Sequence, residues 1–258
     1  GIFLSLAALN WLLEICKWRT LASVVQPVSF REAVRQSLAS LTVSLATPGR
    51  IGEYGAKAVF FPSNLRKKVL LLTLFSNAAQ MAVTCLLGIV GLAYTATIFD
   101  WKLSQWHLLL VVLSLVFFGI ICVRYRKRSL WIRGLSLSNI FGFLRQLPQT
   151  VKWNTMAFAF GRYLVFGLLF YALLQFFGAG IPLLEAVPII LSMYLLVSVL
   201  PTLFLFDVVV RGGVAVWLFG LAGVPEWPVL YAVFSMWLLN FVLPALWGSY
   251  YVILYRRK

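Results

Sequence analysis

Long apolar runs, separated by short polar or proline-containing breaks, make up most of the chain. A helix needs about 20 largely apolar residues to cross a membrane. Runs that approach this length predict continuous helices over residues 2–18, 69–97, 106–123, 153–177 and 227–255. Residues 129–147 mix polar and apolar positions and include Arg133 and Arg145, which favours a helix lying in the membrane interface.

Two further runs, residues 30–62 and 182–222, are interrupted near their middle. The first breaks at Pro48, because proline lacks a backbone donor and clashes with the preceding turn, and Gly49 and Gly52 permit a tight turn there. The second breaks at Pro201 and resumes near Asp207. Neither half of either run reaches the ~20 residues of a membrane span. Each run therefore predicts a re-entrant hairpin, which enters and leaves the membrane on one side.

The composition requires a lipid environment. Hydrophobic residues make up 62% of the 258 residues and charged residues only 11%, against about 25% charged residues in an ordinary soluble domain. Disorder, a nucleic-acid-binding domain and an ordinary water-soluble enzyme are thereby excluded. His107 is the single histidine, and Cys16, Cys85 and Cys122 are scattered singly. We therefore expect no metal, no cofactor and no nucleic-acid partner.

The positions of the basic residues indicate the topology. The chain has 22 Lys and Arg against seven acids, and cytoplasmic loops of membrane proteins are enriched in Lys and Arg. If the two hairpins enter from opposite faces, 17 basic residues lie on the cytoplasmic side, including the C-terminal cluster, and Lys102 alone lies outside. The remaining four basic residues, Arg50, Lys57, Arg162 and Arg211, fall within apolar segments.

This arrangement predicts an all-α, multi-pass membrane protein built as an inverted repeat of transmembrane helices with two re-entrant hairpins. One membrane domain covers residues 1–258, with a first repeat at 1–98 containing the hairpin 30–62 and a second at 104–258 containing the hairpin 182–222. The second repeat has an additional leading helix at 106–123, so we expect one helix to be missing before Gly1.

Charged residues within the apolar segments are the candidate site. Glu53 and Lys57, and likewise Asp207 and Arg211, lie four residues apart, which puts each acid and base on one helix face. With Arg50 and Arg162 added, four bases face two acids. An isolated charge at mid-membrane costs about 2.5–3.5 kcal/mol on insertion scales, so these groups must be paired, hydrated or bound to a ligand. The surplus of two positive charges predicts an anionic lipid headgroup.

Structural roles compete with this interpretation. Lys57 and Arg211 could extend to the membrane surface, and Arg162 could simply hold the helix bundle together. Polar residues elsewhere predict an interfacial ion pair and hydrogen bonds between helices. The ion pair is expected among Glu14, Lys17 and Arg19, and the hydrogen bonds at Asn10, Asn77 and Gln80. No G-x-S-x-G, Walker or H-E-x-x-H motif is present, so we expect no enzyme activity.

The stretch LATPGRIGEYGAKAVFF resembles the membrane domain of lysylphosphatidylglycerol synthase, a flippase-like transmembrane family of bacteria and archaea. The family's Pro-Gly-Arg-x-Gly-Glu turn is matched at Pro48, Gly49, Arg50, Gly52 and Glu53. The preceding helix is similar too, at Asn10, Leu13, Glu14 and Trp18. The second hairpin departs from the family, since its glycines, Gly212 and Gly213, follow Asp207. The chain shows no aminoacyl-transferase domain, so lipid synthesis is not implied.

The resemblance and the charge pattern together predict a flippase that moves a lipid with a charged, phosphate-containing headgroup across the bacterial cytoplasmic membrane. Arg50, Lys57, Arg162 and Arg211 would bind the headgroup, and Glu53 and Asp207 would orient these bases or carry coupling protons. Alternatives are a polyprenyl-phosphate carrier, a non-transporting subunit that regulates a lipid-modifying enzyme, and an intramembrane enzyme acting on headgroups. Expected partners are membrane lipids, a second copy of the chain or a lipid-synthesis enzyme.

Overall fold

A computed structural model describes residues 1–47, 50–99, 137–199 and 204–256. Within these ranges the chain is helical and contains no strand. The helices are α1 (Ile2–Ala22), α2 (Phe30–Leu45), α3 (Gly52–Val59), α4 (Arg66–Ile98), α6 (Leu137–Gln146), α7 (Gln149–Phe176), α8 (Leu183–Val199), α9 (Phe204–Leu221), α10 (Glu226–Trp237) and α11 (Leu243–Arg256). A π-helical turn, Leu238–Val242, joins α10 to α11.

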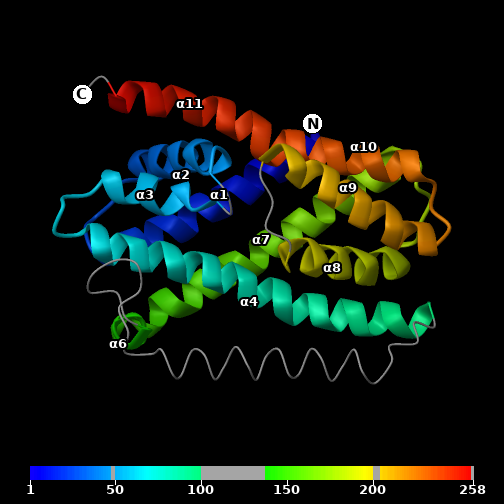
Figure 1. Ribbon diagram of the computed structural model, residues 1–258, viewed down its shortest axis with the longest axis horizontal. Coiled ribbons are helices and arrows are strands. Elements are labelled where there is room, and N and C mark those ends of the chain that lie inside the picture. The colour runs from blue at the N-terminus through cyan, green and yellow to red at the C-terminus, as the bar shows by residue number, and fades with distance from the viewer. Residues whose placement is uncertain (48–49, 100–136, 200–203, 257–258) are drawn as a thin grey trace.

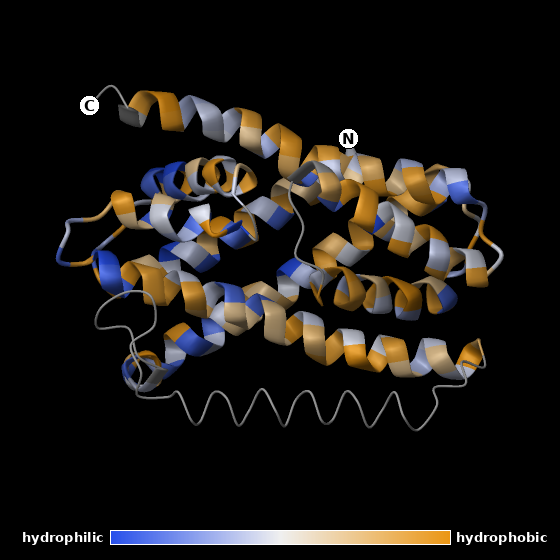
Figure 2. Cartoon of the chain, viewed as in Figure 1, coloured by the Kyte–Doolittle hydropathy of each residue, from blue (hydrophilic) through white to orange (hydrophobic). Residues whose placement is uncertain are grey.

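Three of the described helical stretches are long and apolar enough to cross a membrane. They are Arg66–Ile98, Gln149–Phe176 and Glu226–Leu254, as expected of a multi-pass membrane protein. Leu86, Ile89 and Val90 of helix α4 are exposed, and Figure 2 shows that hydrophobic residues make up much of the length of the long helices. Such exposure is expected where the solvent is hydrocarbon.

The two interrupted segments occupy opposite ends of the molecule (Figure 1). Helix α4 runs along the long axis and packs against both segments, contacting α3 near its start and α8 near its end. Helices α2 and α3 pack against each other at one end, and α8 and α9 pack against each other at the other end. The last turn of α2, the start of α3, the end of α8 and the start of α9 all face the middle of the long axis (Figure 1).

The apolar core is divided in the same way. One cluster lies among α7, α8, α9 and α10 and includes Phe170, Ile189 and Leu218. A second lies around α1, α2, α3 and α4 and is centred on the fully buried Trp18 and Leu72. Each end of the molecule therefore has its own apolar packing, which leaves the region between them for polar side chains.

The predicted helix at residues 227–255 differs from the structure by the π turn at Leu238–Val242. In a regular helix the amide of residue 244 would donate to the carbonyl of Asn240, but Pro244 has no amide hydrogen. The carbonyl of Asn240 instead accepts a hydrogen bond from Trp11 Nε1 at 3.2 Å. The helix register changes at this point, and α11 continues beyond it to pack against α2.

Several predicted features lie outside the described residues. These are Pro48, Gly49 and Pro201 at the helix breaks, the helix at 106–123 with His107 and Cys122, and the first part of the interfacial helix at 129–147. The described remainder of that last segment is helical over Leu137–Gln146 and ends with Arg145 in its final turn.

Helix α4 approaches α8 closely at two glycines, Gly88 and Gly91. A Cβ atom at Gly91 would lie 2.8 Å from the carbonyl oxygen of Pro188 and would also overlap Leu191 Cβ. Hydrogen bonding between Thr95 Oγ1 and Ser192 Oγ, at 3.1 Å, continues the contact toward the end of α4. Small residues let helix backbones approach in this way in membranes, where van der Waals packing drives helix association.

We therefore predict that Gly91→Ala destabilises the protein, although alanine favours a helix more than glycine does. Overpacking of this kind costs about 1–3 kcal/mol, so the midpoint of thermal unfolding in detergent should fall. Gly213→Ala is the matched control, because Gly213 is also inside a helix but has open space around it. An unfolding midpoint for Gly91→Ala at or above that of Gly213→Ala would contradict the close packing.

Candidate functional site

A cavity of ≈ 620 Å³ lies where the two ends of the molecule meet. Side chains from α1, α2, α3, α4, α7, α8 and α9 line it. Its charged lining residues are Glu14, Lys17, Arg50, Glu53, Lys57, Arg162, Asp207 and Arg211. These are five bases and three acids, so the lining carries a formal surplus of two positive charges.

One group of ions joins α1 to α7. Glu14 accepts hydrogen bonds from Lys17 Nζ at 2.7 Å and from Arg162 Nη1 at 2.5 Å. We call these three residues the Glu14 triad. Arg162 Nε also donates to Asn10 Oδ1 at 3.1 Å. With two bases and one acid, the triad has a formal charge of +1.

Hydrogen bonds through Asn10 connect the Glu14 triad to the π turn. Asn10 Nδ2 donates to Asn240 Oδ1 at 2.8 Å, and Asn240 Nδ2 donates to the carbonyl of Met236 at 3.1 Å. Asn10 and Asn240 are both almost fully buried. Arg162 is therefore held by a chain of side-chain amides that reaches across to the π turn and α10.

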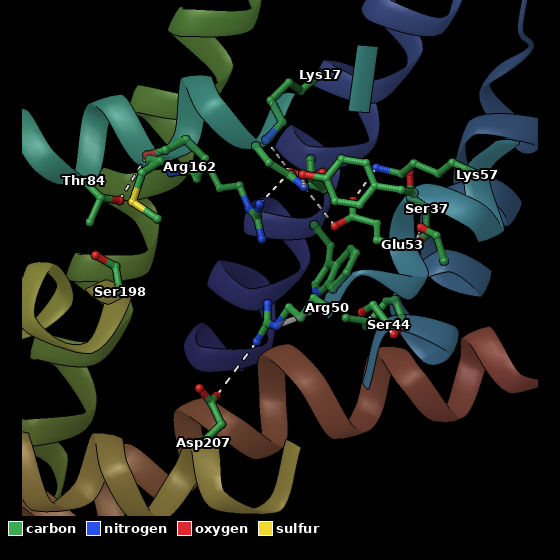
Figure 3. Close-up of a pocket in the computed structure, with 18 of the residues that line it drawn as sticks. Lys17, Ser37, Ser44, Arg50, Glu53, Lys57, Thr84, Arg162, Ser198 and Asp207 are labelled. Atoms are coloured by element: carbon green, nitrogen blue, oxygen red, sulfur yellow. Dashed lines mark hydrogen bonds and ion pairs between the residues drawn. The ribbon is translucent and has the colours of Figure 1, made fainter. Parts of the chain in front are cut away.

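A second group of ions joins the two interrupted segments. Arg211 Nε donates to Asp207 Oδ2 at 2.8 Å within α9. Arg50, which precedes α3, reaches the same oxygen with Nη2 at 3.9 Å (Figure 3). The guanidinium carbons of Arg50 and Arg211 lie 4.6 and 5.6 Å from the ring centroid of Phe241. We call Arg50, Asp207 and Arg211 the Asp207 triad, and it also has a formal charge of +1.

Arg50 has a backbone φ of 58°, in the left-handed region. This conformation is uncommon for a residue with a side chain and costs on the order of 1–3 kcal/mol. Tight packing accompanies it two residues later. Gly52 N donates to Thr47 Oγ1 at 2.8 Å, and a Cβ on Gly52 would lie 2.8 Å from the carbonyl of Val43. The backbone around the break thus fixes the direction of Arg50.

A neutral pair completes the charged lining. Lys57 Nζ lies 2.6 Å from Glu53 Oε1 and 4.3 Å from the ring centroid of Trp18. The second carboxylate oxygen of Glu53 accepts from Asn77 Nδ2 at 3.4 Å. Lys57 is 1% exposed, so it does not extend to a membrane surface. That structural alternative for Lys57 is wrong.

Hydroxyl groups supplement the charges. Ser37, Ser40, Ser44, Thr84 and Ser198 also line the cavity. Ser40, Ser44 and Ser198 donate their hydroxyls to carbonyls of their own helices. The hydroxyl of Ser37 is buried and has no hydrogen-bond partner among the described residues. Ser37 therefore contributes a hydroxyl to the cavity wall that no other described group uses.

The structure brings together every predicted charged residue of the site: Arg50, Glu53, Lys57, Arg162, Asp207 and Arg211 all line this cavity. It places Gly52 at the start of α3 beside them. Asn77 and Gln80 form the predicted hydrogen bonds between helices, with Glu53 and with the carbonyl of Ala159. The described residues contain no cluster of His, Cys, Asp and Glu that could hold a metal ion.

The prediction of an interfacial ion pair at Glu14 and Lys17 is wrong. The two residues do pair, but both are buried and line the cavity. Arg19 does not join them and donates to the carbonyl of Val28. The signal in the sequence was the placement of Glu14 and Lys17 three residues apart, on one face of a largely apolar helix. Phe241 gave no signal, because aromatic residues are frequent throughout this chain.

Replacing Glu14 tests the burial of its triad. In Glu14→Gln the neutral amide leaves Lys17 and Arg162 facing each other, and breaking a buried ion pair in this way costs about 3–5 kcal/mol. We expect a marked fall in the unfolding midpoint in detergent, and partial recovery in Glu14→Gln/Lys17→Met, which removes one of the stranded cations. Glu185→Gln is the control, since Glu185 is an exposed acid in the first turn of α8. Equal midpoints for Glu14→Gln and Glu185→Gln would show that the triad is hydrated like a surface pair.

Comparisons of the chain with protein-family models, curated proteins and solved structures found no match. What the cavity binds must therefore be inferred from its own residues and geometry.

Proposed function

We propose that the protein is a flippase, or a closely related transporter, for membrane lipids with an anionic, phosphate-containing headgroup. The observation that carries this proposal is the charge surplus inside the membrane protein: five bases and three acids line one cavity in the middle of the described structure. Uncompensated cations are expensive in an apolar interior. An anionic headgroup would neutralise them while its acyl chains remained in the surrounding hydrocarbon.

We infer that α2–α3 and α8–α9 are re-entrant hairpins that enter from opposite faces, within inverted repeats covering residues 1–98 and 104–258. Three observations support this. The two pairs lie at opposite ends of the long axis (Figure 1). The contact of Arg50 with Asp207 links them at the middle. Helix α11 ends at the same end of the molecule at which α2 and α4 begin with basic residues (Figure 1), as expected if that end is cytoplasmic.

The position of the charged residues between the two proposed hairpins favours transport. In transporters of inverted-repeat architecture, the substrate site lies near the membrane midplane between the repeats, and access alternates as one part moves against the other. Arg50 and Asp207 come from different hairpins, and their 3.9 Å contact is the longest ion pair of the site. A headgroup that binds Arg50 would compete with Asp207 for the guanidinium group of Arg50. Binding would thus loosen the connection between the hairpins, and release would restore it.

The resemblance to the membrane domain of lysylphosphatidylglycerol synthase points the same way. The matched residues Arg50, Gly52 and Glu53 lie at or beside the cavity. In this proposal Arg50, Lys57, Arg162 and Arg211 provide the positive field for the headgroup. Glu53 and Asp207 orient the bases, and they are the groups through which proton coupling would run. A bacterial cytoplasmic membrane is the location that this function implies.

Two other classes of function remain distinguishable by experiment. A subunit that only regulates a lipid-modifying enzyme would bind lipid but would not move it across vesicles on its own. An intramembrane enzyme would form a new headgroup product in detergent without a partner. Flipping by the purified protein alone supports transport against both.

We predict that Arg50→Ala and Glu53→Ala reduce flipping to the rate of protein-free vesicles while the protein still inserts. Arg50→Ala removes a cation of the surplus, and Glu53→Ala strands the buried Lys57. The assay uses reconstituted vesicles that contain a fluorescent phosphatidic acid, and it measures how much of the inner-leaflet label becomes accessible to an impermeant quencher added outside. Lys68→Ala and Glu185→Ala are the controls, because both side chains are exposed and outside the cavity. Wild-type rates for Arg50→Ala and Glu53→Ala would refute the assignment of this cavity to transport.

A further inference from the structure

The positive surplus of the cavity is divided between two separate places. The Glu14 triad contributes +1 from α1 and α7, and the Asp207 triad contributes +1 from α9 and from Arg50 in the turn before α3. Glu53 and Lys57 form a pair and contribute nothing. A ligand with a single negative charge would therefore leave one triad uncompensated wherever it bound.

Arginine side chains are the groups available to that ligand. The side chains of Lys17 and Lys57 are each 1% exposed and are paired with Glu14 and Glu53, and Lys57 also packs on the ring of Trp18. Those of Arg50, Arg162 and Arg211 are 41%, 24% and 22% exposed, and Figure 3 shows Arg50 and Arg162 directed into the space between the helices. The guanidinium group presents parallel N–H donors that match phosphate oxygens, and its proton is not lost at any ordinary pH.

The cavity also offers more hydrogen-bond donors than the two free oxygens of a phosphodiester can accept from. The three exposed arginines converge from α7, α9 and the turn before α3. Ser37, a buried residue of the cavity wall, adds a hydroxyl that has no partner within the described part of the chain. A phosphodiester has two unesterified oxygens, whereas a phosphate monoester has three and a diphosphate has more. A terminal phosphate would therefore use this set of donors more fully.

We propose that the site selects lipids whose headgroup is a phosphate monoester or diphosphate with two or more negative charges, in preference to monoanionic phosphodiesters and to zwitterionic or cationic headgroups. This inference rests on the proposed function and names its substrate class. Each triad meets one negative charge of the headgroup. The class includes the polyprenyl phosphates, whose carrier was an alternative suggested by the sequence.

Binding to the purified full chain in detergent tests this selectivity. The probes are dioctanoyl phosphatidic acid, a monoester, and dioctanoyl phosphatidylglycerol, a diester with the same tails. At pH 8 the monoester carries about two charges, so we expect it to bind at least about tenfold more tightly. At pH 5.5 it carries about one charge, since its second ionisation lies near pH 6, and the preference should shrink toward unity. The diester keeps one charge throughout.

The affinity for the diester also shows whether any group of the protein changes its charge between the two pH values. The described titratable groups that face the cavity are its eight charged residues and Tyr54. If one of these changed charge between pH 5.5 and 8, the affinity for phosphatidylglycerol would change as well. A change confined to phosphatidic acid is therefore assigned to the ligand.

Variants that remove one surplus cation sharpen the test without stranding an acid. Arg162→Gln leaves Glu14 paired with Lys17, and Arg50→Gln leaves Asp207 paired with Arg211. Each variant should retain its fold and lose most of the tenfold preference, because only one uncompensated charge remains. Lys68→Gln, outside the cavity, should keep the full preference. Unfolding midpoints measured on the same samples verify that the variants are folded.

Equal or tighter binding of phosphatidylglycerol at pH 8 would overturn the inference, as would an unchanged preference in both arginine variants. Inorganic phosphate is the last probe. If it bound as tightly as phosphatidic acid, the ligand would be a free anion and the lipid assignment would be overturned. Flipping of both lipids at equal rates would overturn this selectivity but leave the proposed function intact. Selective binding of the monoester without flipping would support the site and refute transport.

Discussion

Neutralisation of charge in an apolar interior is the constraint on which this structure depends. Eight charged side chains line one cavity in a chain whose long helices expose apolar surface outward. Each acid among them lies within 4 Å of at least one base, and four of the five bases also lie over an aromatic ring. Removing ions from water is repaid only when partners and hydrogen bonds are well placed. The helix breaks and packing in the middle of the molecule bring these partners into position.

Helix irregularities deliver these groups to the middle. Arg50 is directed by a backbone in the left-handed conformation just before α3. Asp207 lies in the first turn of α9, just after the second interruption. Phe241 and Asn240 lie in the π turn before Pro244. A regular helix satisfies its own backbone and presents one continuous face, whereas a broken one can present a charged side chain at its end and free a carbonyl for a neighbour.

Periodicity and charge spacing predicted a large part of this architecture. Apolar run lengths located the long helices, and the acid–base spacing at Glu53–Lys57 and Asp207–Arg211 predicted pairs that the structure contains. The same reasoning failed at Glu14 and Lys17. A helical pattern identifies which residues share a face, but not which helix covers that face. Here α7 covers α1 and brings Arg162 opposite Glu14, so a pair expected at the surface is buried. The contacts of Arg50 and Arg211 with the ring of Phe241 likewise depend on tertiary packing that local sequence does not encode.

The arrangement of the surplus explains how the protein tolerates it before a ligand binds. The two lysines, Lys17 and Lys57, each have a carboxylate within 2.7 Å and almost no exposure. The more exposed arginines face a cavity of ≈ 620 Å³, which is wide enough for water to solvate them. Surplus charge is therefore confined to groups that can be hydrated. A headgroup that replaces this water with phosphate oxygens gains from electrostatics in proportion to its charge, so the feature that makes the unliganded cavity stable also makes it discriminate between headgroups.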